Sequence, residues 1–237
     1  MSRDITIELK DINQRFQEKD LFKESINFTI TQDKAILLYG GSGSGKTSLF
    51  NILVGLQKPS SGELFWDKQK ITKLQVANKI RVSYMSVVFS NFSFINELSI
   101  KENILLGATL SNIENIEEKL QDLAATVLNF QDEDPNIDLS ELLKKSSVDN
   151  LSNGQKEIIM IASTLLLEAP IVVADEMLRS FPEDTKVILY KRLLKYFKEK
   201  RVGLFYITHW QGAKEIIAES DFPHEVYKLQ EQKLIKG

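Results

Sequence analysis

Eight consecutive residues in the first quarter of the chain have the types and spacing of a phosphate-binding loop. Residues 40–47 read Gly-Gly-Ser-Gly-Ser-Gly-Lys-Thr and fit the pattern Gly-x-x-x-x-Gly-Lys-[Ser/Thr]. Glycines let backbone N–H groups close around phosphates, the lysine reaches the outer phosphates, and the threonine hydroxyl is a ligand for Mg²⁺. We therefore predict that the chain binds a nucleoside triphosphate. The residues assigned to this loop are Gly40, Gly41, Ser42, Gly43, Ser44, Gly45, Lys46, Thr47 and the adjoining Ser48.

Two adjacent carboxylates, Asp175 and Glu176, follow the apolar run 171–174. The run is typical of a buried strand, and two charges at its end are costly without a cation. Taken alone, the pair also fits a strand that turns into an acidic loop. Paired with the phosphate-binding loop, the first acid holds Mg²⁺ and the second polarises the attacking water. We assign Asp175, with Thr47, to the metal and Glu176 to the general base.

A third motif, residues 151–155, reads Leu-Ser-Asn-Gly-Gln and stands directly before the helical pattern that leads to the two acids. Ser152 is a good helix cap, and Gly154 keeps the backbone open. The segment is thus a second helix N-terminus suited to a phosphate. By itself it is also compatible with an ordinary cap.

In this order, the three motifs resemble those of an ATP-binding cassette (ABC) ATPase over essentially the whole chain. The resemblance implies that the ligands are ATP and Mg²⁺ and that two cassettes close head to tail, as a homodimer or a heterodimer. It also implies that Ser152, Asn153, Gly154 and Gln155 contact ATP bound to the opposite subunit. Asn153 stands where the family usually has glycine, and asparagine tolerates that place if the backbone is left-handed.

Two more residues match the family by position. His209, at the end of the apolar run 202–208, corresponds to the switch histidine that touches the γ-phosphate and orients the water, although histidines at strand ends are often structural. Phe16 falls where the family stacks an aromatic ring on adenine, and a core phenylalanine is an equally good reading.

Two family positions are altered. Ser90 follows Val87-Val88-Phe89 where the family has the glutamine of the Q-loop, and serine is too short to copy it; Asn91 would take the role if the register slipped by one residue. Pro182 replaces the closing aspartate of the loop after the catalytic acid, and proline lacks an N–H and fixes φ. We expect an ATPase with atypical coupling between its subunits and its partner.

The elements that position these residues alternate between strand and helix. Residues 35–39 read as a strand before the phosphate-binding loop and residues 48–54 as a helix after it, closed by Gly55. Alternation of this kind predicts a mostly parallel sheet covered on both faces. Shorter strands are expected at 5–9, 25–30 and 63–66, helices within 96–145 with helical spacing over 113–130, and further helices and strands at 155–168, 171–174, 183–200 and 202–208.

With the resemblance, this pattern predicts an α/β fold: a P-loop NTPase (RecA-like) core with a mostly parallel sheet, an N-terminal antiparallel β subdomain and an α-helical insertion. Residues 1–237 are expected to form a single ABC ATPase domain. Its β subdomain and catalytic core would comprise residues 1–90 and 151–237, and its helical subdomain residues 91–150 or thereabouts.

The composition of the chain limits the partners and the location that can be expected of it. The 237 residues carry a net charge of -3 from 30 basic and 33 acidic residues, so we expect no nucleic-acid partner. Cysteine is absent, the N-terminus has no apolar signal core, and the most apolar stretch is too broken to cross a bilayer. We expect a cytoplasmic protein that is peripheral on the inner face of the cell membrane.

The expected function is the ATP-hydrolysing subunit of an ABC transporter that works with a second ABC ATPase subunit and an integral membrane permease. The segments 80–89 and 92–104 are similar to the ATPases that release lipoproteins, export macrolides or act in cell division. The alternatives are a soluble ABC ATPase of iron–sulfur cluster assembly and a weakly hydrolysing regulatory cassette; the presence of Glu176 and His209 argues against the regulator.

Overall fold

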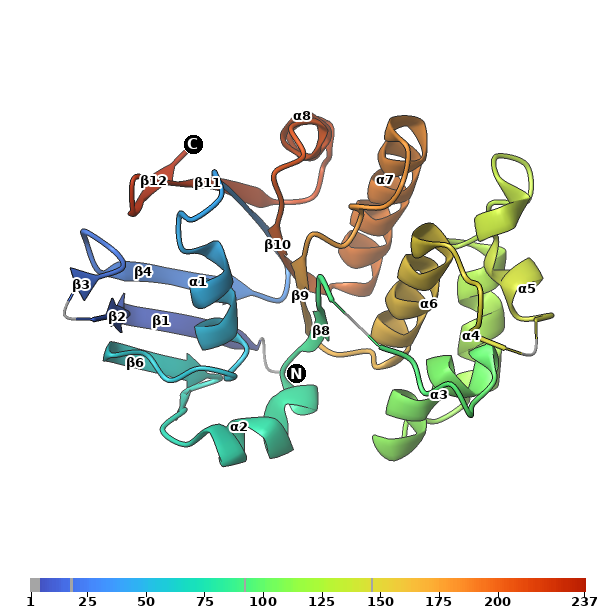
Figure 1. Cartoon of the computed structure of the whole chain (residues 1–237), viewed down its shortest axis with the longest axis horizontal. Helices are drawn as coiled ribbons and strands as arrows, with labels where there is room; N and C mark the ends of the chain where they lie inside the picture. Colours follow the sequence, from blue (N-terminus) through green and yellow to red (C-terminus); the bar gives the residue numbers. More distant parts are fainter. Residues whose placement is uncertain (1–4, 18, 92, 146) are drawn as a thin grey trace.

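A six-stranded sheet brings together segments that lie far apart in the sequence (Figure 1). The computed structural model describes residues 5–17, 19–91, 93–145 and 147–237, and for Phe16 the backbone alone. The strand order is β12-β11-β5-β10-β9-β8; β11 to β8 are parallel, and β12 is antiparallel to β11. The strands are β5 (Ala35–Tyr39), β8 (Ser86–Val88), β9 (Ile171–Asp175), β10 (Gly203–Ile207), β11 (His224–Gln230) and β12 (Lys233–Lys236).

Two apolar cores form because successive residues of a strand face opposite sides of the sheet. In β5, Ala35 and Leu37 join one core, whereas Ile36 and Leu38 join the other. Both faces of the sheet are therefore covered, and this explains why β5, β9 and β10 are continuous apolar runs rather than alternating ones.

Helices cover one face. In Figure 1, α6 (Asn153–Leu166) lies nearer the strands, and α3 (Ile100–Leu110), α4 (Ile116–Ala125) and α5 (Leu139–Leu142) lie farther out. Ser99 starts the first of these outer helices with a capping box to Glu102. The elements in this core are α3 (Ile100–Leu110), α4 (Ile116–Ala125), η2 (Pro135–Ile137), α5 (Leu139–Leu142), α6 (Asn153–Leu166), α7 (Glu183–Lys200) and α8 (Gly212–Glu219).

An antiparallel sheet of order β4-β1-β6-β7 contributes to the core on the other face, together with α1 (Lys46–Leu53), the helix that follows the phosphate-binding loop. Its strands are β1 (Thr6–Asn13), β4 (Ile26–Thr31), β6 (Ser61–Trp66) and β7 (Gln69–Lys70). The remaining elements are the two-stranded ribbon of β2 (Arg15–Phe16) and β3 (Lys19–Asp20), α2 (Leu74–Ile80) and η1 (Arg81–Ser83).

The structure confirms the predicted fold class, with its mostly parallel sheet, antiparallel N-terminal strands and helical insertion. The helical pattern over 113–130 was too long, because α4 ends at Ala125. The Thr126 hydroxyl donates to the Asp122 carbonyl at 2.6 Å and so occupies the acceptor that the next helical N–H would use. Among the described residues, no helix is both long and apolar enough to cross a membrane.

Candidate functional site

The predicted catalytic residues meet at one edge of the parallel sheet, where the strands end. Strand β10 lies between β5 and β9, and its Ile207 is in register with Leu38 of β5 and Asp175 of β9. The phosphate-binding loop follows β5, Glu176 follows β9, and His209 follows β10. The crevice beyond the carboxyl ends of parallel strands is the usual ligand site of such sheets.

The phosphate-binding loop needs glycine at specific places. Gly43 and Gly45 have φ of 74° and 105°, where other residues are strained. A Cβ on Gly45 would lie 2.9 Å from Cε1 of Phe22, and a Cβ on Gly40 would lie 2.3 Å from the Leu229 carbonyl oxygen. The loop backbone is therefore packed closely from behind, and this fixes the direction of its N–H groups.

The same loop has polar groups available to an anion. No side chain caps the N-terminus of α1, so its first N–H groups and its positive dipole end face the loop. The Ser44 hydroxyl is buried without a hydrogen-bond partner. The Lys46 ammonium donates to the carbonyl oxygens of Gly40 and Gly41 at 2.8 and 2.9 Å and so lies across the loop. These groups fit the phosphates of a nucleotide, whose oxygens would supply the acceptors.

Glu176 is held firmly at the end of β9. Its backbone is left-handed, with φ of 53°, and its N–H donates to the Ile207 carbonyl at 2.9 Å. One carboxylate oxygen lies 2.6 Å from Nδ1 of His209, and the other accepts from the Thr208 hydroxyl at 3.1 Å. The His209 side chain is 69% exposed and that of Glu176 only 14%. A strained backbone with a fixed, half-enclosed carboxylate is typical of a functional position.

Asp175 is partly buried beside this pair. Burial raises the pKa of the Asp175 carboxyl, and a hydrogen bond from Ser90 and the charge of Lys46 act in the opposite direction. Among the residues that the structure describes, no group of three or more His, Cys, Asp or Glu side chains could hold a metal. A hard cation at Asp175 and the exposed Thr47 would therefore rely on phosphate oxygens and water, which is how proteins usually hold Mg²⁺.

The third motif begins α6. The Ser152 hydroxyl accepts from the Gln155 N–H at 3.2 Å, and the Gln155 side chain accepts in return from the Ser152 N–H at 3.0 Å, which is a capping box. Asn153 is not left-handed, so the condition under which asparagine would copy the usual glycine is not met: it is the first residue of the helix and has no positive φ. Because the capping box already fixes the turn here, the glycine conformation is not needed.

The comparisons with known proteins agree with this geometry. The family model for the ABC transporter matches residues 23–179. The chain belongs to the ABC transporter family. This membership places it among the ATP-binding cassette ATPases and confirms the resemblance that the three motifs suggested.

The curated relatives of this cassette are named for different transport functions. The Fe(3+) ions import ATP-binding protein FbpC of Escherichia coli O157:H7 is 27% identical over 221 residues, which cover 93% of this chain and 59% of FbpC. The putative hemin import ATP-binding protein HrtA of Staphylococcus haemolyticus is 28% identical over 86% of this chain and 90% of HrtA. The macrolide export ATP-binding/permease protein MacB of Campylobacter jejuni is 29% identical over 85% of this chain and 30% of MacB.

Solved cassettes share the fold. The dimeric structure of MJ0796, a bacterial ABC transporter cassette, superposes with a TM-score of 0.75 at 22% identity and covers 97% of this chain and 98% of its own. The ATP-binding subunit of another ABC transporter has a TM-score of 0.78 at 19% identity, covering 98% of this chain and 89% of its own. These likenesses confirm the cassette fold.

Ser90, one of the altered positions of this cassette, lies at the centre of the site. Its hydroxyl lowers the pKa of the Asp175 carboxyl against the effect of burial, and its carbonyl accepts from Nη2 of Arg179 at 3.3 Å. Sequence reasoning treated Ser90 as a lost glutamine and did not single out Arg179. The sequence signal that could have identified Arg179 is a basic residue only three positions after Glu176.

Pro182, the other altered position, starts α7 as its N-cap, with φ of -59°, and its carbonyl accepts from the backbone N–H of Lys186 at 2.9 Å. The loop before it is tied to α6: the buried Glu157 carboxylate accepts from the Ser180 N–H at 3.2 Å and from its hydroxyl at 2.7 Å. Burial raises the pKa of Glu157, and the bonds from Ser180 oppose the rise. The loop is thus anchored within its own subunit.

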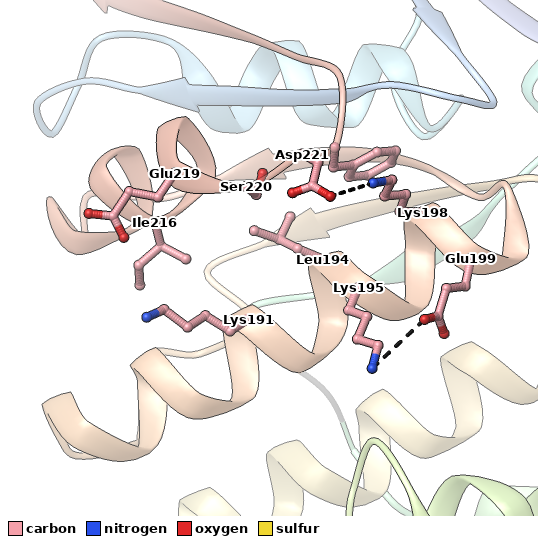
Figure 2. A pocket seen from close by; sticks show the side chains of 10 residues that line it. Lys191, Leu194, Lys195, Lys198, Glu199, Ile216, Glu219, Ser220 and Asp221 are labelled. Atoms are coloured by element: carbon pink, nitrogen blue, oxygen red, sulfur yellow. Dashed lines mark hydrogen bonds and ion pairs between the residues drawn. The ribbon is translucent and has the colours of Figure 1, made fainter.

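Two cavities border the site residues. One of about 460 Å³ adjoins Gly41–Ser44, Lys23 and residues 229–232, and one of about 260 Å³ is lined by Glu176, His209 and Trp210 among others. A groove of about 560 Å³ between α7 and α8 is separate (Figure 2): none of the predicted site residues lines it. The side chain of Phe16 lies outside the described residues, so its predicted stacking stays a prediction.

Proposed function

We propose that this chain is the ATP-hydrolysing subunit of an ABC transporter and that Glu176 is its general base. One observation carries the proposal: both oxygens of Glu176 are held, by His209 and Thr208, at the sheet edge where the phosphate-binding loop begins. A base must be fixed close to the water that it activates, and a positioned base contributes about 100- to 10,000-fold to a rate.

In this proposal the loop residues Gly40–Ser48 hold the phosphates, with Lys46 turning from the loop carbonyls to the outer phosphates. Thr47 and Asp175 would hold Mg²⁺, which neutralises charge on the phosphates when it is bound. Glu176 accepts the proton of the attacking water, while His209 orients the γ-phosphate and the water. Phe16 would stack on adenine.

The proposal includes a second cassette. The structural neighbour MJ0796 is described as dimeric, and one of its structures as a post-hydrolysis state bound to ADP and Pi. By analogy, Ser152–Gln155 of one subunit would contact ATP held by the other. We also propose the division into a β subdomain and core, 1–90 and 151–237, and a helical subdomain of about 91–150, in which the described residues contain helices and turns.

The transport partner is proposed to be a separate integral membrane permease, which would keep the cassette on the cytoplasmic face of the membrane. We favour the lipoprotein-release or export type, supported by the segments 80–89 and 92–104 and by the similarity to MacB. The similarity to FbpC and HrtA supports transport in general, because their names refer to import.

The test is ATP turnover with and without membrane proteins that co-purify with the tagged chain from its own source. We expect a detergent-dependent complex that stimulates turnover, and loss of this stimulation in Glu176→Gln. The matched control is Glu219→Gln, which removes an exposed carboxylate from the separate α7–α8 groove. Stimulation by a soluble scaffold protein instead would refute the transporter proposal in favour of iron–sulfur cluster assembly.

A further inference from the structure

Trp210, the residue after His209, connects three parts of the structure. Its indole Nε1 donates to the Glu183 carboxylate at 2.6 Å, and its ring packs edge-on against the buried Tyr190 with centroids 5.8 Å apart. Its backbone N–H donates to the Thr208 hydroxyl at 3.1 Å. A surface residue of a flexible turn would not be fixed at ring, indole nitrogen and backbone together.

The contact with Thr208 reaches the Glu176 carboxylate through one hydroxyl group. A hydroxyl has one hydrogen to donate. Because the Thr208 oxygen accepts from Trp210, its hydrogen is left to donate to Glu176, where the oxygens are 3.1 Å apart. The other Glu176 oxygen faces His209 at 2.6 Å. The backbone N–H of Trp210 is therefore linked through the Thr208 hydroxyl to Glu176, which the proposed mechanism uses together with His209.

The contact with Glu183 reaches the same pair from the other side. Glu183 is the first residue of α7 and follows the loop 177–182, which itself begins next to Glu176. A hydrogen bond from an indole to a carboxylate is charge-assisted and short. Lys186, one turn farther along α7, places its ammonium 5.9 Å from the centre of the indole ring. The contacts thus close a ring: Glu176, the loop, Glu183, Trp210, Thr208 and Glu176 again.

We propose that Trp210 is a positioning residue that fixes Glu176 and His209 relative to each other and makes their geometry depend on the loop 177–182. The inference rests on the proposed function, because it assigns Trp210 to the same reaction. Its physical basis is stiffness: without the indole bond, α7 and the segment 208–210 are held together by ring packing alone, and a displacement of about 1 Å costs up to 100-fold in rate.

The first experiment compares ATP turnover of Trp210→Phe and Glu183→Ala with the parent. Phenylalanine keeps an aromatic ring that can pack against Tyr190, but it removes the indole N–H donor together with the five-membered ring. We expect kcat to fall roughly 10- to 100-fold in both, with little change in KM for ATP. In the Glu176→Gln background Trp210→Phe should not lower the residual rate further, because residues that act as a unit are not additive. An equal further loss would overturn the proposal, as would a parent-like kcat in Trp210→Phe.

The second experiment does not depend on turnover. The chain has two histidines, His209 and His224. His224 pairs with Ala35 at the start of β5, whereas His209 follows the end of β10, and Nδ1 of His224 lies 3.0 Å from the Phe222 carbonyl. In ¹⁵N NMR spectra of the nucleotide-free protein we expect Trp210→Phe to shift the ring nitrogens of His209 and to leave those of His224 unchanged. Unchanged His209 signals would refute the positioning role. If Trp210→Phe shifted the His209 signals but the parent showed no ATPase activity, the positioning role would be supported and only the proposed function would be refuted.

Discussion

The glycines of the phosphate-binding loop allow a test that separates two kinds of constraint. Backbone strain and close packing both favour glycine, and the four positions combine them differently. Gly41 has neither a positive φ nor any atom within 4 Å of the place that a Cβ would take, and Gly43 has only the positive φ of 74°. Gly40 has only the close contact, and Gly45 has both. Comparing alanine at the four positions therefore separates backbone strain from close packing.

The magnitudes follow from these geometries. At Gly41 alanine should be neutral or stabilising by about 0.4–1 kcal/mol, because it restricts the unfolded chain. At Gly43 the left-handed backbone should cost about 1–2 kcal/mol. At Gly45 the same strain is joined by overpacking of about 1–3 kcal/mol, because the added methyl would lie 2.9 Å from the buried Phe22 ring. At Gly40 the backbone carbonyl of Leu229 is 2.3 Å away, and we expect about 1–3 kcal/mol from overpacking alone.

The assay is urea unfolding of the four nucleotide-free variants and the parent, with the free energy of unfolding obtained by linear extrapolation. The expected order of stability places Gly41→Ala highest and Gly45→Ala lowest. If Gly43→Ala and Gly45→Ala lost the same free energy, the packing of the loop against Phe22 would be refuted. Four equal losses would contradict the whole loop geometry.

Three further predictions concern binding, charge and the third motif. Lys46→Ala should weaken ATP binding by about 1.5–3 kcal/mol through loss of a charged phosphate contact, and unchanged affinity in calorimetry would remove Lys46 from the site. Asp175→Asn should unfold at higher urea than the parent at pH 7 without Mg²⁺: the raised pKa of the folded carboxyl gives stability in acid that is lost as pH rises through that value. The difference should disappear below the ordinary aspartate value of about 3.9, and a persistent difference there would exclude this cause. Ser152→Ala should lower stability by about 1 kcal/mol, since it removes the cap of α6, and a variant as stable as the parent in urea would show that the cap contributes nothing.

The sequence predicted those parts of the fold that rest on local patterns. The helix 183–200 was predicted at its observed bounds because its apolar stripe, its acidic first turn and its preceding proline all agree. Strand β11 was not predicted, because it begins at His224 and mixes charged with half-buried apolar residues. Its place is set by pairing with β5, which lies far away in the chain.

The same distinction between local patterns and long-range contacts applies to the candidate site. Motifs with fixed spacing identified the phosphate-binding loop, the two acids and the helix cap, because each occupies one contiguous segment. The contacts between segments were not visible in the sequence: the bond from Arg179 to the Ser90 carbonyl and the bond from Trp210 to Glu183 join residues whose distances depend on the packing of the sheet and α7. From the sequence, Ser90 could only be described as a replacement of the expected glutamine, whereas in the structure its side chain acts on Asp175, the predicted metal ligand.

The most direct test of the account is single-turnover ATP hydrolysis by the purified chain and its Glu176→Gln variant, with ATP binding measured on the same samples and Glu219→Gln as the control. We predict that Glu176→Gln binds ATP as the parent does, while its hydrolysis rate falls about 100- to 10,000-fold, and that Glu219→Gln matches the parent. Equal hydrolysis by the parent and Glu176→Gln would contradict the assignment of Glu176 as the general base.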